Sequence, residues 1–219
     1  MKFAAILMAP ALCGLAMADG EGEEHFDIGL YASNGSIATG GWDHDTESME
    51  VSSLRLFEAH FGEDPAFPYS IDEPGIGGTA DLLGMNSGDS FSMNLVSGVL
   101  AWNGSSFASS AESMGMTFGP STVDAATGGS IDFQVSEDFD LHPEYFIDEN
   151  AASGSYLLEF TFSAAGLNTS ESIFIVFNNG MDDELFEETV EWAEANIVPV
   201  HGAWLLLGGL GLRRRNRRD

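Results

Sequence analysis

Short runs of alternating apolar and polar residues follow one another along most of this chain. The two clearest, residues 156–162 and 172–177, are rich in aromatic and β-branched side chains, which favour pleated sheet surfaces. Residues 26–31 alternate in the same way, and the Asn34-Gly35 pair after them predicts a hairpin that closes on residues 36–39. Further strands are expected at residues 54–61, 90–96, 99–102, 113–118, 131–135 and 145–147.

One segment of the body has a convincing helical pattern. Along residues 182–196, apolar side chains recur at helical spacing, and acidic residues at its start suit the positive end of a helix dipole. Residues 62–78 hold three prolines and predict a long loop or an edge strand, because proline is excluded from central strands. The whole pattern predicts a mainly β fold. We expect an antiparallel β-sandwich, jelly-roll or immunoglobulin-like, with one C-terminal amphipathic helix leading to a short hydrophobic tail.

The two ends of the chain have the composition of sorting signals. Residues 1–18 combine Lys2 with an apolar run and the small residues Ala16 and Ala18, which predicts a secretory signal peptide cleaved after Ala18. At the other end, Val198 and Pro199 precede the apolar residues 203–212, a run shorter than the ~20 residues of a spanning helix. A cluster of arginines, which favours the cytoplasmic side, closes the chain: Arg213, Arg214, Arg215, Arg217 and Arg218. We therefore expect a signal peptide (1–18), an acidic β-sandwich domain (19–197) and a C-terminal sorting signal (198–219).

The tail resembles the PEP-CTERM sorting signal, with Val198-Pro199-Val200-His201 where that family has Val-Pro-Glu-Pro. This resemblance implies that the export machinery delivers the chain and that an exosortase-like processing enzyme removes the tail. The tail would contact the membrane before processing, and the body would reach the cell surface or the extracellular space. Residues 26–28, 56–59, 61–65 and 72–75 also resemble segments of uncharacterised exported bacterial proteins with such tails, which implies a β-rich body.

Charge separates the body from its two ends. The chain has a formal net charge of −28, yet Arg55 is the single basic residue between Lys2 and the arginine cluster. Nucleic acid is excluded as a partner, because binding its phosphates needs a basic patch. Divalent cations and extracellular polysaccharide remain as expected partners. The single cysteine, Cys13, lies in the expected signal peptide, so the mature body would have neither disulfides nor thiol chemistry.

Two kinds of metal site are predicted from acidic and histidine residues. Carboxylates at alternate positions, as in calcium-binding loops, occur with a histidine in the sequence Asp43, His44, Asp45 and Glu47. The spacing is not that of an EF-hand, since Ser48 and Leu54 replace the required Gly and Glu. Zn²⁺ is the alternative to Ca²⁺, with His44 and His142 as expected ligands if the fold gathers histidines that are distant in sequence. A solvated acidic turn and isolated surface histidines are the other interpretation.

Two tryptophans in turn-like contexts, Trp42 and Trp102, are candidates for stacking on sugar rings; the alternative is that they belong to the core. The sequence contains neither a Gly-x-Ser-x-Gly elbow nor a glycine-rich phosphate loop. With so many acidic residues, no carboxylate pair stands out as catalytic. We therefore expect a non-enzymatic secreted or cell-surface protein, a structural or adhesive component of the envelope or extracellular matrix. The alternatives are a calcium-dependent carbohydrate-binding module and an exported zinc-binding protein.

Overall fold

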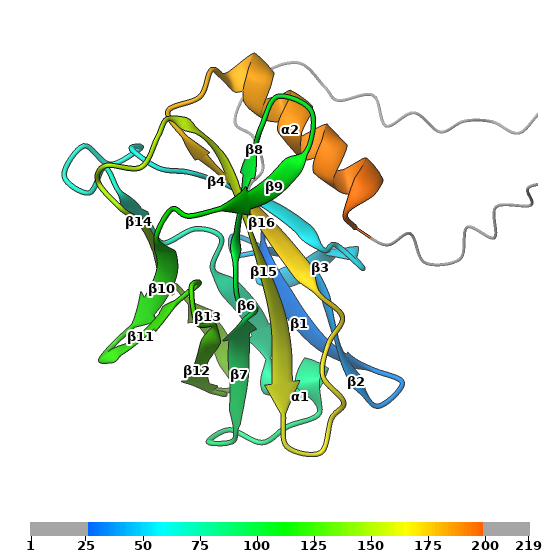
Figure 1. Cartoon of the computed structure of the whole chain (residues 1–219). Helices are drawn as coiled ribbons and strands as arrows, with labels where there is room; N and C mark the ends of the chain where they lie inside the picture. Colours follow the sequence, from blue (N-terminus) through cyan, green and yellow to red (C-terminus); the bar gives the residue numbers. More distant parts are fainter. Residues whose placement is uncertain (1–25, 199–219) are drawn as a thin grey trace, which may run out of the picture.

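The structure, a computed structural model, describes residues 26–198. The described part is mainly β, with several sheets and a C-terminal helix (Figure 1). The strands are β1 (Asp27–Ser33), β2 (Ser36–Asp43), β3 (Ser48–Ser52), β4 (Leu56–His60), β5 (Ser70–Ile71), β6 (Ile76–Thr79), β7 (Ser90–Leu95), β8 (Val99–Trp102), β9 (Phe107–Ser110), β10 (Met114–Phe118), β11 (Ser121–Asp124), β12 (Gly129–Gln134), β13 (Asp138–Leu141), β14 (Glu144–Ile147), β15 (Gly154–Ala164) and β16 (Ile173–Asn179). The helices are α1 (Ala80–Leu83) and α2 (Asp183–Asn196).

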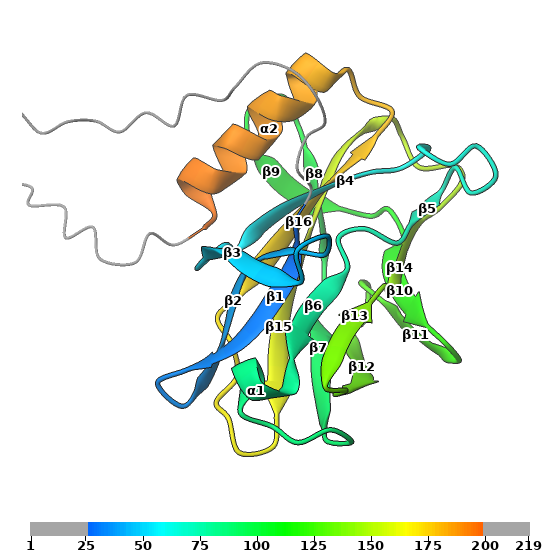
Figure 2. The same ribbon diagram turned by 180° about the vertical axis from the view of Figure 1, so that it is seen from behind.

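The first sheet has the strand order β13-β6-β1-β2-β3, visible from behind in Figure 2. Its β1–β2 hairpin turns at Asn34 and Gly35, whose positive φ angles of 51° and 80° are those of the expected Asn-Gly turn. β6 runs parallel to β1 and antiparallel to β13, so it is an interior strand. Strands β1, β6 and β13, which are distant in sequence, therefore lie side by side in the first sheet.

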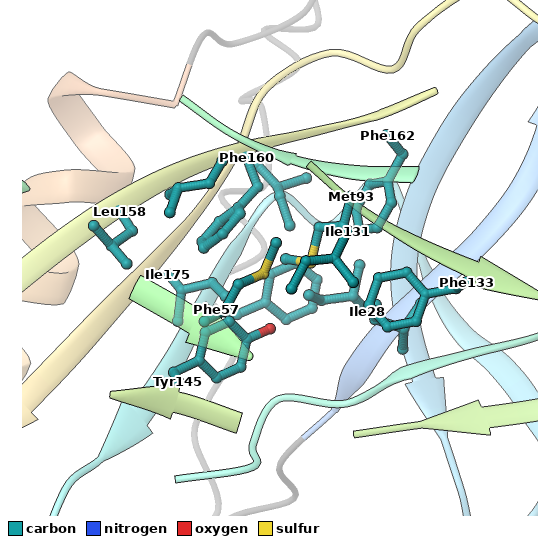
Figure 3. Close-up of a cluster of buried hydrophobic side chains, with 14 of the residues drawn as sticks. Ile28, Phe57, Met93, Ile131, Phe133, Tyr145, Leu158, Phe160, Phe162 and Ile175 are labelled. Atoms are coloured by element: carbon teal, nitrogen blue, oxygen red, sulfur yellow. The ribbon is translucent and has the colours of Figure 1, made fainter. Parts of the chain in front are cut away.

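Two further sheets complete the β structure. The larger one has the order β12-β7-β15-β16-β4, with the β8–β9 hairpin attached to β15. The smaller one has the order β11-β10-β14-β5. Strands from all three sheets contribute to one apolar core, as Ile28, Phe160 and Tyr145 illustrate in Figure 3. The mainly β prediction is thus confirmed, and the body has a single large core cluster formed by all three sheets.

Helix α2 covers the opposite face of the largest sheet. Side chains alternate along a strand, so Leu158 of β15 enters the large core while Leu157 points to the helix. On the helix, Phe186, Val190 and Ala193 pack against that outer face, as the helical spacing predicted. None of the helices in residues 26–198 has the length and apolarity needed to cross a membrane.

The prediction that residues 62–78 form a loop or an edge strand was wrong for the last part of this range. β6 begins at Ile76, two residues after Pro74, so proline removes no donor from the interior ladder. Gly77 and Gly78 gave β6 little strand signal, although both lie in it. Strands β3, β9, β11 and β13 were also not predicted, because they are short and polar.

Several predicted sorting residues lie outside the part of the chain that the structure describes. They are Ala16, Ala18, Pro199, Arg213, Arg214, Arg215, Arg217 and Arg218. Val198 is described: it is half-buried, and its N–H donates to the Ala193 carbonyl, 3.2 Å away, at the end of α2. The first residue of the expected sorting signal therefore packs on the end of this helix.

Candidate functional site

The predicted calcium loop is a solvent-exposed turn between β2 and β3. The Asp43 Oδ1 atom accepts hydrogen bonds from the N–H groups of Asp45 (2.8 Å) and Thr46 (3.2 Å). These bonds, led by the one from Thr46, lower the pKa of the Asp43 carboxyl. His44 lies 3.3 Å from the neighbouring Asp45 carboxylate, and both side chains are exposed, as is Glu47. Among the described residues these side chains do not gather into a metal-binding group, which favours the solvated-turn interpretation.

The structure separates the two tryptophans that were expected to bind sugar. Trp42 is 4% exposed, and its ring covers Gly77 so closely that a Cβ there would lie 2.0 Å from it. The prediction for Trp42 was therefore wrong, because no face of this ring is open to a sugar. Trp102 is half-buried and makes edge contacts with Phe107 and with Trp192 of α2, at centroid distances of 5.4 Å and 5.5 Å. Its role in sugar binding stays a prediction.

A different group of side chains comes together at the edge of the first sheet. One ligand atom from each of Asp27, Asp140 and His142 lies within 4.8 Å of the others. Asp27 begins β1, whereas Asp140 belongs to β13 and His142 follows that strand directly. Gly75, just before β6, lies between them: a Cβ there would be 2.8 Å from His142 Cε1 and 2.9 Å from Asp27 Oδ1. Because Gly75 has no side chain, β1 and β13, the strands on either side of β6, can bring these groups together.

Asp27 is the buried member of the group. The residue is 4% exposed, and its Oδ1 atom accepts a 2.6 Å hydrogen bond from the Gly75 N–H. Its Oδ2 atom is buried and has no hydrogen-bond donor among the described residues. Leaving a buried carboxylate oxygen without a partner is costly, and native structures rarely do so. This atom therefore marks a place for a proton or a cation.

The neighbouring Glu73 carboxyl group can supply that proton. Burial, the Asp27 negative charge and a hydrogen bond between the two carboxyl groups raise the pKa of Glu73 to about 7. Two carboxyl groups form such a bond only when one of them carries a proton, so Asp27 Oδ2 lacks a donor when both are ionised. The Glu73 side chain is 45% exposed, which leaves it free to release that proton to solvent. A cation and this proton are thus alternative partners of Asp27.

His142 is held in an orientation suited to a metal ligand. Its Nδ1 atom lies 3.1 Å from the Asp72 carbonyl, and its Nε2 atom lies 3.0 Å from Asp140 Oδ1. An Nδ1–H that donates to a backbone carbonyl leaves Nε2 as the metal-binding nitrogen, the usual arrangement around histidine ligands. Burial disfavours the charged ring, but the Asp72 carbonyl and the neighbouring carboxylates outweigh it and raise the pKa of His142. His142 Nε2 thus faces the Asp140 carboxylate.

Tyr145 anchors the site from the core side. Its buried hydroxyl donates to the Pro74 carbonyl at 3.1 Å and so fixes the segment that carries Glu73 and Gly75. Burial, together with the charges of Asp27 and Glu73, raises the pKa of Tyr145 well above its ordinary value. The hydroxyl therefore stays protonated and acts as a hydrogen-bond donor.

One imidazole nitrogen and two carboxylates match the ligand preference of Zn²⁺ and related transition-metal ions. Ca²⁺ is bound by oxygen ligands, so this set does not favour it. Of the predicted ligands, His142 joins the group, while His44 lies in the β2–β3 turn. Sequence reasoning missed Asp27, Glu73 and Asp140; the Asp140-x-His142 alternation was the one local signal available. The chain matches no protein-family model, no curated protein and no solved structure.

Proposed function

We propose that this chain is an exported, non-enzymatic surface protein whose body binds a divalent transition-metal ion, Zn²⁺ foremost. The observation that carries the metal site is the buried Asp27 Oδ2 atom, which has no donor among the described residues and lies beside two further ligands. A bound cation would give this oxygen its partner and would replace the proton that Glu73 otherwise holds. The acidic body and the imidazole nitrogen of His142 favour such a cation over an anion.

Each residue has a distinct part in this proposal. Asp27 and Asp140 supply carboxylate oxygens, and His142 supplies Nε2. The Asp72 carbonyl keeps the His142 ring in place from the other side. Zn²⁺ commonly has four ligands, so water or the adjacent Glu73 carboxylate would complete the set.

A zinc titration of the purified full chain tests the metal site. We expect one equivalent of zinc to bind, and to be lost in Asp140→Asn and in His142→Gln. Both substitutions keep the approximate size of the side chain and change half-exposed or exposed positions, so folding should survive. Competition against a chelating indicator would give the affinity, and circular dichroism would check the fold.

The matched control is the double variant His44→Gln/Asp45→Asn, which removes the same residue types from the β2–β3 turn. We expect it to bind zinc as the wild type does. Unaltered zinc binding in both Asp140→Asn and His142→Gln would refute the site. Equal loss in the control variant would mean that zinc binds through diffuse acidic charge.

For delivery, we propose that residues 1–18 direct export and that residues 198–219 are removed by an exosortase-like enzyme. The end of α2 at Asn196, two residues before Val198, supports a folded body that stops close to where the proposed tail begins. We also propose that the sheets pack as a β-sandwich, as their shared core supports. Expression in hosts with and without an exosortase tests processing: the mass of the C-terminus should differ between them, and an identical intact tail would exclude it.

A further inference from the structure

A cavity of about 350 Å³ lies beside the candidate metal site. His142 lines both, and the cavity wall continues with Ser70 and Asp72 around β5 and with Glu144 of β14. Ile71 of β5, together with Asp64 and Phe67 in the loop between β4 and β5, completes the lining. The volume is within the range of small-molecule sites, roughly 300–1,000 Å³. We call it the Phe67 cavity.

The charge of the Phe67 cavity selects for cations. Three of the residues that line it, Asp64, Asp72 and Glu144, are acidic. For the side chains of Asp72 and Glu144, the described part of the chain contains no hydrogen-bonding or ionic partner. Arg55, the one Lys or Arg among residues 26–198, is 8% exposed and pairs with Glu171 at 3.0 Å. No Lys or Arg of residues 26–198 therefore lines this cavity, and the histidine that does, His142, is already paired with Asp140 at 3.0 Å.

Phe67 distinguishes an organic cation from a simple metal ion. Its side chain is 61% exposed, the largest exposure among the large hydrophobic residues of residues 26–198. The nearby Tyr69 is also exposed, whereas most aromatic side chains of the body are buried. An aromatic face helps to bind methylene groups through apolar contact and ammonium ions through cation–π attraction. It contributes little to the binding of a hydrated metal ion.

We propose that the Phe67 cavity binds a small aliphatic polyamine, with ammonium groups on the carboxylates and methylene groups on Phe67. Such a molecule combines positive charges with an apolar chain, as the lining combines the acidic residues Asp64, Asp72 and Glu144 with Phe67. Anionic ligands are repelled by the same three carboxylates. This site is separate from the metal centre and does not depend on it, although His142 lines both.

Calorimetric titration of spermidine into the full chain, freed of metal by a chelating resin, tests this proposal. We expect one binding event that weakens with added salt. Asp72→Asn/Glu144→Gln should weaken spermidine binding about tenfold or more, because it removes two charge-assisted hydrogen bonds. Phe67→Ala should weaken it about threefold to fivefold, as expected for an exposed cation–π contact. A neutral diol of similar length should not bind.

The matched control is Glu188→Gln/Glu191→Gln, which removes two exposed carboxylates from α2 and should leave spermidine binding unchanged. Equal weakening by the control pair, or no effect of Phe67→Ala, would overturn the proposal, since spermidine would then bind only the diffuse charge. Zinc binding measured on the same variants should be unaffected by Phe67→Ala. Loss of zinc binding and loss of spermidine binding thus refute different proposals.

Discussion

Two regions of this protein carry the same residue types and differ in what holds them. The β2–β3 turn places Asp43, His44 and Asp45 next to one another in sequence, where they satisfy each other and face solvent. The edge of the first sheet brings Asp27 and His142 together from strands far apart in sequence and buries one carboxylate oxygen without a donor among the described residues. Residues close in sequence form a turn whose Asp43 carboxylate has hydrogen-bond donors. Residues that converge from distant strands bury an Asp27 oxygen that has no donor among the described residues. The second arrangement is the one that can select a ligand.

The largest expected effect comes from filling the space that allows this convergence. Gly75→Ala would place a Cβ against both His142 and Asp27. Overpacking of this kind costs about 1–3 kcal/mol, and it should also displace the zinc ligands. Chemical denaturation and zinc titration would measure the two effects. Gly154→Ala is the matched control, because no atom lies within 4 Å of its added Cβ; equal stability of the two variants would contradict this account.

The contributions of the two regions to folding stability should also change with pH in opposite directions. The pKa of Glu73 is raised to about 7 from 4.5, so the folded state holds its proton more tightly than the unfolded state does. Its contribution to stability is present below about 4.5 and is lost as pH rises to about 7. After allowance for its exposure to solvent, we expect a change of about 1–2 kcal/mol in the metal-free protein. Asp43 has a lowered pKa, so its contribution is lost as pH falls instead.

Denaturation curves of the metal-free protein between pH 4 and pH 8, roughly spanning both folded and unfolded values, would show the Glu73 effect. Glu73→Gln keeps the shape of the side chain and removes its titration. The free energy of unfolding of the wild type should therefore fall relative to that of the variant as pH rises across this range. A constant difference would mean that Asp27 and Glu73 do not share a proton.

A smaller effect is expected from the anchor beneath the site. Tyr145→Phe removes the hydroxyl that donates to the Pro74 carbonyl and leaves that buried oxygen without its 3.1 Å partner. Losing such a hydrogen bond costs about 1 kcal/mol. Zinc affinity should fall as well, because the segment that carries Gly75 loses a hydrogen bond that holds it in place. Tyr156→Phe, which also removes a tyrosine hydroxyl bonded to a backbone carbonyl, is the control for stability alone and should leave zinc affinity unchanged.

The sequence predicted the elements whose signal is local. The Asn34-Gly35 turn, the aromatic strands β15 and β16, and the amphipathic α2 follow from propensity and periodicity, and the structure confirms them. The interior strand β6 was missed because its glycines resemble a loop. In the sheet these glycines allow close packing, because a Cβ at Gly77 would collide with Trp42 and one at Gly78 with Phe139.

The site was only partly predictable for the same reason. His142 was expected to bind metal, but its partners depend on β6 lying between β1 and β13, a pairing that no local pattern reveals. Asp27 is one of many acidic residues in the sequence, and only burial makes it unusual. The expectation that Trp42 is exposed failed because turn-like neighbours are also found where glycines allow a large ring to pack on a sheet.

The smallest expected effect concerns the turn itself. Asp43→Asn keeps a side-chain oxygen that can accept from the N–H groups of Asp45 and Thr46, so the turn should survive with a melting temperature close to that of the wild type. Asp27→Asn makes the same chemical change at the buried position, where it removes the charge that attracts a cation. Zinc titration should therefore separate two identical substitutions: unchanged binding for Asp43→Asn and lost binding for Asp27→Asn. If both variants bound zinc equally, burial and convergence would not be what distinguishes the two regions.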